Sequence, residues 1–412
     1  MPASPHSPPP RVGPRPLPLH LARATSVWSS SIAALPLAKN GSLPWNARLA
    51  AQAAALAPSL ENAAADALGV ALAGEATRRL GEMLAGIEAY TDHPYRRPLQ
   101  DPPVLWRDGA TRLLDYGARR RKPFDVTALF VPSLVNRAYI LDLTKRRSLM
   151  RHLAGHGVRP LLVDWGAPGE AERDLTLTDY VAGRLDAALD AAVAASGGPV
   201  AVVGYCMGGL LALALALRRS ADVRGLALLA TPWDFHADNA AHARLLGAAE
   251  APLTALVETC GELPVDLIQA LFTALDPNLV ANKFRAFARL DPASDEAAFF
   301  VALEDWLNDG VALTAPVARE CLVDWYGHNT PARGRWRIDD TPVRPGDLDM
   351  PALVVVPKRD RIVPPASAAA LAEAIPGAER LVPPSGHIGM VVGGAGPRHL
   401  WRPLADWLRR LP

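Results

Sequence analysis

The chain has 412 residues, with 43 basic and 42 acidic side chains and a formal net charge of +1. This balance argues against a nucleic-acid-binding protein and against attraction to an anionic membrane. Three cysteines exclude a disulfide framework and are typical of a reducing compartment, and their spacing offers no metal site. Glycines interrupt the longest apolar run, 200–217, and the N-terminus lacks a basic segment before an apolar core. We therefore expect no transmembrane segment, no secretory signal and a cytoplasmic location.

The first 124 residues are unlike the rest of the chain. Residues 1–45 are rich in Pro, Ser and Arg, which predicts a disordered tail. Residues 46–90 are rich in Ala and Leu with scattered charges, so we expect an accessory helical region over 46–124. We favour a helical hairpin packed on the main domain over a helix that binds a partner or another surface.

From about residue 125, apolar strands alternate with helical segments. This pattern predicts an α/β domain over 125–412 with a mostly parallel, doubly wound sheet. The expected strands are 127–131, 159–163, 200–204, 225–230, 352–356 and 379–382. Between the second and third of these, apolar residues repeat every four positions from Leu177 to Leu189, which predicts a helix with Thr178 as its N-cap.

The alternation breaks between about 235 and 345. Helical patterns and aromatic residues fill this interval, and a single short β-like stretch lies near 336–338. We expect the interval to form an inserted helical lid over an active site.

Residues 199–218 are the most informative segment of the chain. An apolar strand leads into a G-x-C-x-G turn, from Gly204 to Gly208, and an apolar helix follows. This order predicts a nucleophile elbow with Cys206 at its tip. The two glycines allow strand and helix to approach, and the helix N-terminus favours a thiolate. The alternative is a structural cysteine buried in a strand-to-helix turn.

A cysteine nucleophile needs a base and a group that orients the base. Asp360 follows the strand 352–356, and His387 follows the next strand in a glycine-flanked loop. The chain order nucleophile, acid, histidine is that of the α/β-hydrolase fold. We therefore predict an α/β-hydrolase with Cys206, Asp360 and His387 as its catalytic triad.

Other residues compete for these roles. Asp234 is the rival acid, because it follows the strand 225–230, and Asp360 could instead pair with a neighbouring arginine at the surface. The rival bases lie in the expected lid, and they are His236, His242 and His328.

The backbone N–H of Met207 is the first expected donor of an oxyanion hole. The second comes from the loop after 127–131, from Val135 or Leu134. The sequence implies no metal and no organic cofactor.

Sulfur in place of oxygen favours acyl transfer over ester hydrolysis. A thiolate exchanges readily with a thioester, because the attacking and leaving groups are both thiols. The acyl-enzyme is then itself a thioester, which is activated towards an alcohol. Cys206 therefore indicates an acyl-CoA as the acyl donor.

Several motifs occur together in one order that is similar to a known family. They are 131–143, 162–166, 175–180, 204–209, 231–236, 306–309, 324–326, 362–364 and 385–388. These segments resemble the poly(3-hydroxyalkanoate) synthases over roughly 85–412, and most of all the short branch that works with a second subunit. Two positions depart from that family, with Arg361 where a histidine is usual and Leu210 where a threonine is common.

The resemblance implies an acyltransferase that polymerises (R)-3-hydroxyacyl-CoA into polyhydroxyalkanoate and releases CoA. Cys206 would carry the chain as a thioester, His387 would act as general base, and Asp360 would orient it. The implied partners are the 3-hydroxyacyl-CoA substrate, a polyester granule surface, and a second synthase subunit or a second copy of the chain. A thioesterase or an intracellular polyhydroxyalkanoate depolymerase with the same triad is the alternative. A non-catalytic, granule-binding relative is the third hypothesis.

Overall fold

A computed structural model describes residues 11–120, 123–238 and 249–412. The chain divides into two compact units. The helical unit comprises the described part of 1–95 together with 269–308. The sheet unit comprises the described parts of 96–268 and 309–412.

The sheet unit is built on eight strands in the order β1-β2-β6-β3-β7-β8-β13-β14. The pairs from β6 to β14 are parallel, whereas β1 and β2 add an antiparallel edge. The strands are β1 Val104–Asp108, β2 Thr111–Asp115, β3 Val126–Val131, β6 Val158–Asp164, β7 Val200–Tyr205, β8 Val223–Leu229, β13 Ala352–Val355 and β14 Glu379–Leu381. The predicted mostly parallel, doubly wound sheet is confirmed.

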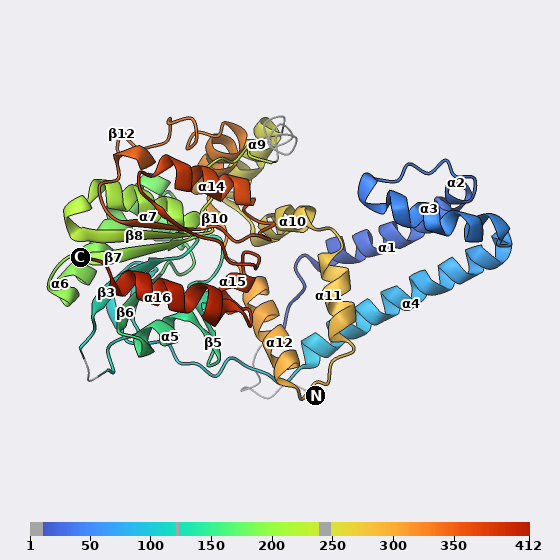
Figure 1. Ribbon diagram of the computed structural model, residues 1–412, viewed down its shortest axis with the longest axis horizontal. Coiled ribbons are helices and arrows are strands. Elements are labelled where there is room, and N and C mark those ends of the chain that lie inside the picture. Colours follow the sequence, from blue (N-terminus) through green and yellow to red (C-terminus); the bar gives the residue numbers. More distant parts are fainter. Residues whose placement is uncertain (1–10, 121–122, 239–248) are drawn as a thin grey trace. The chain divides into compact units, whose positions relative to one another are not determined.

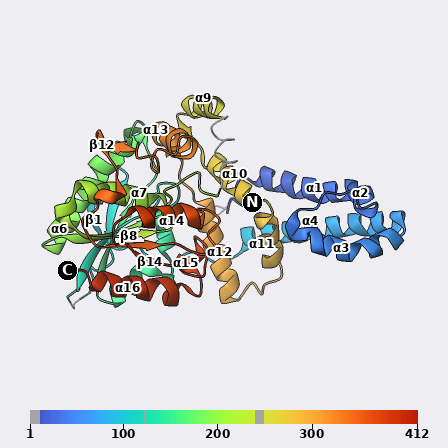
Figure 2. The same cartoon turned by 45° about the horizontal axis from the view of Figure 1, so that its top comes forward.

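Helices cover both faces of this sheet (Figures 1 and 2). One face carries α5 Leu149–Gly155 and α16 Arg402–Arg409, and the other carries α6 Asp186–Ser196 and α7 Met207–Arg218. Every residue of β3 and β7 is buried, as expected for apolar, Val-rich strands covered on both sides. The core of the unit therefore lies against these central strands, and both point their C-terminal ends at the same edge of the sheet.

The edge hairpin β1–β2 lies where we expected an accessory helical region, so that expectation is wrong for 104–115. The two strands are joined by the two-residue turn Gly109-Ala110, and Gly109 has a positive φ of 57°. Glycine at the first position of a two-residue loop is typical of a tight hairpin, a signal that the composition of the region obscured. The expected helices do form nearer the N-terminus, as α3 Ala47–Asn62 and α4 Ala65–Asp92.

The helical unit also corrects two other expectations. Helices α1 Leu17–Ala33 and α2 Leu35–Lys39 occupy part of the expected disordered tail 1–45, whose residues 1–10 lie outside the described residues. Much of the expected lid 235–345 belongs to this unit too, as α11 Leu279–Phe287 and α12 Asp295–Asn308.

Apolar packing explains both corrections. The C-terminal part of α4 lies beside α11 (Figure 1). The buried cluster of the unit consists of Ala24, Met83, Ile87, Tyr90, Phe284, Phe287, Ala297 and Val301. Residues far apart in sequence thus form one core, which a local pattern does not reveal.

The rest of the expected lid and the connecting segments contribute short elements. These are η1 Ala138–Leu141, β4 Asp142–Thr144, β5 Arg147–Ser148, η2 Glu170–Glu172, η3 Asp179–Leu185, η4 Ser220–Asp222, α9 Glu250–Cys260, β9 Glu262–Leu263, α10 Val265–Leu275, β10 Leu313–Thr314, α13 Ala315–Arg319, η5 Glu320–Gly327, β11 Arg337–Ile338, β12 Thr341–Pro342, η6 Pro345–Asp347, α14 Pro365–Ala374, α15 Gly389–Val392 and η7 Pro397–Trp401. The expected β-like stretch is β11. Among the described residues, no helix combines the length and the apolar character that a membrane span requires.

The helical segment that contains Leu177 starts from a different cap than expected. The hydroxyl of Thr176 accepts a hydrogen bond from the backbone N–H of Asp179, and the Asp179 carboxylate accepts one from the N–H of Thr176. This reciprocal pair is a capping box. Thr178 is already helical and makes no side-chain cap, so the expected N-cap is wrong by two residues.

Replacement of Phe284 by Ala tests the core of the helical unit. The ring is fully buried between α4 and α12, so its loss should lower the free energy of unfolding by about 3–5 kcal/mol. Leu279 on the same helix is 54% exposed, and Leu279→Ala should cost only about 0.5 kcal/mol. Urea unfolding followed by circular dichroism measures both, and equal losses would contradict this packing.

Candidate active site

Cys206 lies at the turn between β7 and α7. It is the N-cap residue of α7, with φ 56° and ψ −130°, which is a strained conformation for a residue with a side chain. Its backbone N–H donates to the carbonyl of Leu229 on β8 at 2.9 Å, and its carbonyl accepts from the N–H of Gly209 at 2.9 Å. The turn is thus held on both sides, and it presents a half-buried thiol at the C-terminal edge of the sheet.

The glycines of the turn are required by close approach. A Cβ on Gly204 would lie 2.4 Å from the Cα of Gly209, and one on Gly208 would lie 2.2 Å from the carbonyl oxygen of Val131. Neither contact is possible for a larger residue without movement of the backbone. The two glycines therefore let α7 start directly against β7 and the end of β3.

Asp360 and His387 form a buried pair in the loops after β13 and β14. The Nδ1 atom of His387 lies 2.7 Å from Oδ2 of Asp360. The other carboxylate oxygen accepts hydrogen bonds from the backbone N–H groups of Ile362 and Val363, at 2.8 and 2.9 Å. Because the Asp360 side chain is fully buried, a surface pair with a neighbouring arginine is excluded. Asp360 thus fixes Nδ1 and leaves Nε2 as the ring nitrogen available to another group.

Cys206 and His387 interact electrostatically. Burial alone would lower the pKa of His387, but the negative charge of the Cys206 sulfur and the hydrogen bonds to Asp360 and Cys206 raise it to about 10. The protonated form of His387 is therefore stabilised by the groups around it. The structure brings together the three side chains that the sequence singled out.

The rival residues have other partners. The Asp234 carboxylate accepts from the backbone N–H of His236 and from the side-chain amide of Asn329. The ring of His236 bonds the carbonyl of Tyr326 at 3.0 Å, and His328 is exposed. These contacts fasten the segment after β8 to the end of η5. His242 lies outside the described residues.

The expected oxyanion loop is in place next to the start of α7. A Cβ on Gly208 would lie 2.4 Å from the carbonyl oxygen of Pro132, so the loop and the helix N-terminus are in close contact. The N–H of Val135 donates to the Ser133 hydroxyl at 3.2 Å. The roles of Met207 and Val135 as donors stay a prediction.

Two tyrosines near the pair were missed by the sequence analysis. The ring of Tyr205 lies 5.2 Å from that of His387. Burial and the charge of Cys206 raise the pKa of Tyr326, which places that phenol within electrostatic reach of the sulfur. Tyr205 could have been noticed because it stands inside the G-x-C-x-G turn, whereas Tyr326 had no local signal.

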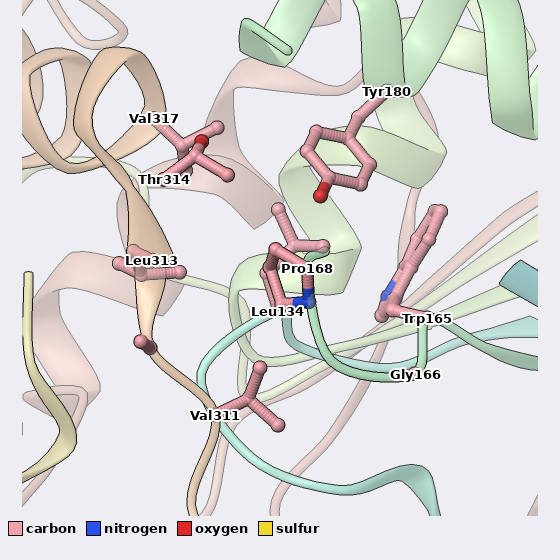
Figure 3. A pocket seen from close by; sticks show the side chains of 10 residues that line it. Leu134, Trp165, Gly166, Pro168, Tyr180, Val311, Leu313, Thr314 and Val317 are labelled. Atoms are coloured by element: carbon pink, nitrogen blue, oxygen red, sulfur yellow. The ribbon is translucent and has the colours of Figure 1, made fainter. Parts of the chain in front are cut away.

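A small, mainly apolar hollow that is open to solvent lies beside the same loop (Figure 3). Its lining is Leu134, Trp165, Gly166, Pro168, Tyr180, Val311, Ala312, Leu313, Thr314 and Val317. The Tyr180 hydroxyl points towards Leu134 and Pro168, while Trp165 and Thr314 donate to backbone carbonyls. Within the described ranges, no group of three or more His, Cys, Asp or Glu residues is placed to hold a metal ion.

Comparison with known proteins identifies the fold and the family of this chain. The family model described as alpha/beta hydrolase fold matches residues 141–394. The "Poly(3-hydroxyalkanoate) polymerase subunit PhaC" of Synechocystis sp. is 33% identical over 297 residues, which cover 69% of this chain and 78% of the relative. The protein of the same name from Allochromatium vinosum is 31% identical, with 71% and 82% covered.

A third relative of that name, from Haloferax mediterranei, is 30% identical over 310 residues. The match covers 74% of this chain but only 63% of the relative's length. By these similarities, the chain belongs to the α/β-hydrolase fold family and, within it, to the poly(3-hydroxyalkanoate) polymerases.

Proposed function

We propose that this chain is an acyltransferase that polymerises (R)-3-hydroxyacyl-CoA and releases CoA. The observation that carries the proposal is the contact of His387 with both Cys206 and Asp360 in a member of this family. Cys206 is the nucleophile, His387 the general acid and base, and Asp360 the group that orients His387.

In the first step, the Cys206 thiolate attacks the carbonyl carbon of the acyl-CoA. A new carbon–sulfur bond forms and the bond from the carbonyl carbon to the CoA sulfur breaks. The CoA thiolate leaves with the proton of the His387 imidazolium. The backbone N–H of Met207 and one from the loop after β3, at Val135 or Leu134, would stabilise the oxyanion, and loss of one such donor typically costs ~10²–10³ in rate.

Acylation then changes the basicity of His387. The charge of the Cys206 sulfur is among the main causes that raise the pKa of His387, and an acylated sulfur carries no such charge. Without that charge, the lowering effect of burial is opposed less strongly, so the pKa of His387 falls. The imidazole is therefore readier to give up its proton to CoA and to act as a neutral base in the next step.

In the second step, the 3-hydroxyl of the next hydroxyacyl-CoA attacks the thioester on Cys206. His387 takes the hydroxyl proton, an ester bond forms, and Cys206 leaves as a thiolate. That thiolate attacks the thioester of the lengthened product, releases CoA and regains the chain, now one unit longer.

The partners follow from the relatives and from the product. The similar proteins are named as polymerase subunits, which supports a second subunit or a second copy for this chain. An insoluble polyester would gather as granules, and the helical unit carries exposed apolar side chains such as Leu37, Leu56 and Val70. We propose that this chain works at the granule surface.

The fate of the acyl group tests the function. Purified protein with 3-hydroxybutyryl-CoA should release CoA and form insoluble polyester, and Cys206→Ala should lower the rate by more than ~10³-fold because the nucleophile is lost. Cys260 is an exposed cysteine on α9, so Cys260→Ala should leave the rate unchanged. CoA release with only free 3-hydroxybutyrate would instead establish a thioesterase.

The raised pKa of His387 predicts that the reactivity of Cys206 depends on this histidine. A protonated imidazole beside the sulfur favours attack of the sulfur on an alkylating reagent. The pH profile of Cys206 alkylation by iodoacetamide, read by peptide mass spectrometry, should therefore change in His387→Gln, with slower alkylation near neutral pH. The exposed His328 provides the control, and His328→Gln should keep the wild-type profile. Identical profiles for wild type and His387→Gln would refute the interaction of His387 with Cys206.

A further inference from the structure

Strand pairing alone does not bring His387 close to Cys206. Cys206 follows β7 and His387 follows β14, and two strands, β8 and β13, lie between them. Neighbouring strands are about 4.8 Å apart, so the two chain ends emerge roughly 14 Å from each other. The loop after β14 must therefore reach back across the edge of the sheet, and contacts other than strand pairing must hold it there.

Asp360 supplies only part of that restraint. It follows β13 and holds one ring nitrogen of His387 through a single hydrogen bond. One bond at Nδ1 fixes the direction of that nitrogen but leaves the imidazole plane free to swing about it. The position of Nε2, the atom that must meet the sulfur, then depends on what lies against the ring.

Tyr205 lies against the ring. Its own ring centroid is 5.2 Å from that of His387, with the planes inclined at 31°. Its hydroxyl donates to the backbone carbonyl of His387 at 3.4 Å, and the residue is only 5% exposed. One side chain therefore contacts both the imidazole and the backbone that carries it.

Tyr205 is itself held by the sheet. It is the last residue of β7, is paired with Leu229 of β8, and directly precedes Cys206. Its position relative to the sulfur is thus set by one peptide unit and by strand pairing. The contact of Tyr205 with His387 therefore fixes the imidazole relative to β7, the strand that leads directly into Cys206.

We propose that Tyr205 is a positioning residue, which holds the imidazole of His387 facing the Cys206 sulfur, although two strands separate the strands that these residues follow. The inference rests on the proposed function, since it assigns His387 the role of base. Tyr205 does not exchange protons in this role, because burial and the charges of Cys206 and Asp360 keep the pKa of its phenol far above the working range. The ring contributes the main restraint and the hydroxyl a smaller one.

Three variants distinguish the effect of the Tyr205 ring from that of its hydroxyl and from that of losing another tyrosine at the end of a strand. Tyr205→Leu removes ring and hydroxyl, Tyr205→Phe removes the hydroxyl alone, and Tyr116→Leu is the matched control. Tyr116 is also a tyrosine at the end of a strand, but its contacts are to Asp142 and Arg151. For each variant the pH profile of Cys206 alkylation is measured, together with kcat and KM for 3-hydroxybutyryl-CoA.

We expect Tyr205→Leu to shift the alkylation profile towards that of His387→Gln. Its kcat should fall roughly 10- to 100-fold, with KM within about twofold of wild type, because proton transfer and not binding is impaired. Tyr205→Phe should keep the wild-type profile and at least about a third of kcat. Tyr116→Leu should change neither the profile nor kcat.

A folded Tyr205→Leu with the wild-type profile and kcat would overturn the proposal, and so would an equal shift in Tyr116→Leu. If Tyr205→Leu does not fold, Tyr205→Met fills the space without a planar ring and gives the same test. Alkylation needs no substrate, so it separates this inference from the function. A profile that responds to His387→Gln but not to loss of the Tyr205 ring refutes only the positioning role, whereas one insensitive to His387→Gln refutes both.

Discussion

The close approach of α7 to the ends of β7 and β3 is the constraint on which the site depends. Only glycine fits at 204 and 208, where an added Cβ would lie 2.4 Å or less from the nearest backbone atom. This contact forces Cys206 into a positive φ and leaves its thiol at the edge of the sheet. It also sets the first N–H groups of α7 against the loop after β3. A bulkier residue at either glycine would separate nucleophile, helix and loop at once.

His387 is brought to this edge by a different kind of interaction. Strand pairing cannot carry His387 across β8 and β13, so buried polar and aromatic contacts do so. Asp360 binds the ring on one side and is itself held by two backbone N–H groups, and Tyr205 lies against the ring face. Charge on the Cys206 sulfur raises the pKa of the imidazole, so the protonation of His387 depends on whether that sulfur is charged.

Much of the fold and of the candidate site could be predicted because their signals are local. The strand, turn and helix around Cys206 are contiguous, and Asp360 and His387 each follow a recognisable apolar strand. The helical unit could not be predicted in the same way. Phe284 and Phe287 lie in the segment expected to form a lid, yet they belong to the same buried cluster as Met83 and Ile87, about 200 residues earlier in the chain. The hairpin at 104–115 had a turn signal in Gly109, but its place at the sheet edge depends on pairing with β6.

The linear chain was enough to predict the parallel strands, the turn at Cys206 and the family that the motifs resemble, because strand periodicity, glycine spacing and chain order are properties of the sequence. The folded structure was needed to show which of Asp360 and Asp234 is the partner of His387. Both follow parallel strands, and hydrogen bonds to His387 in one case and to Asn329 in the other separate them. The same holds for Tyr205 and His387, which are 182 residues apart. Their contact exists because four strands pair in one order, and pairing order is a property of the folded sheet.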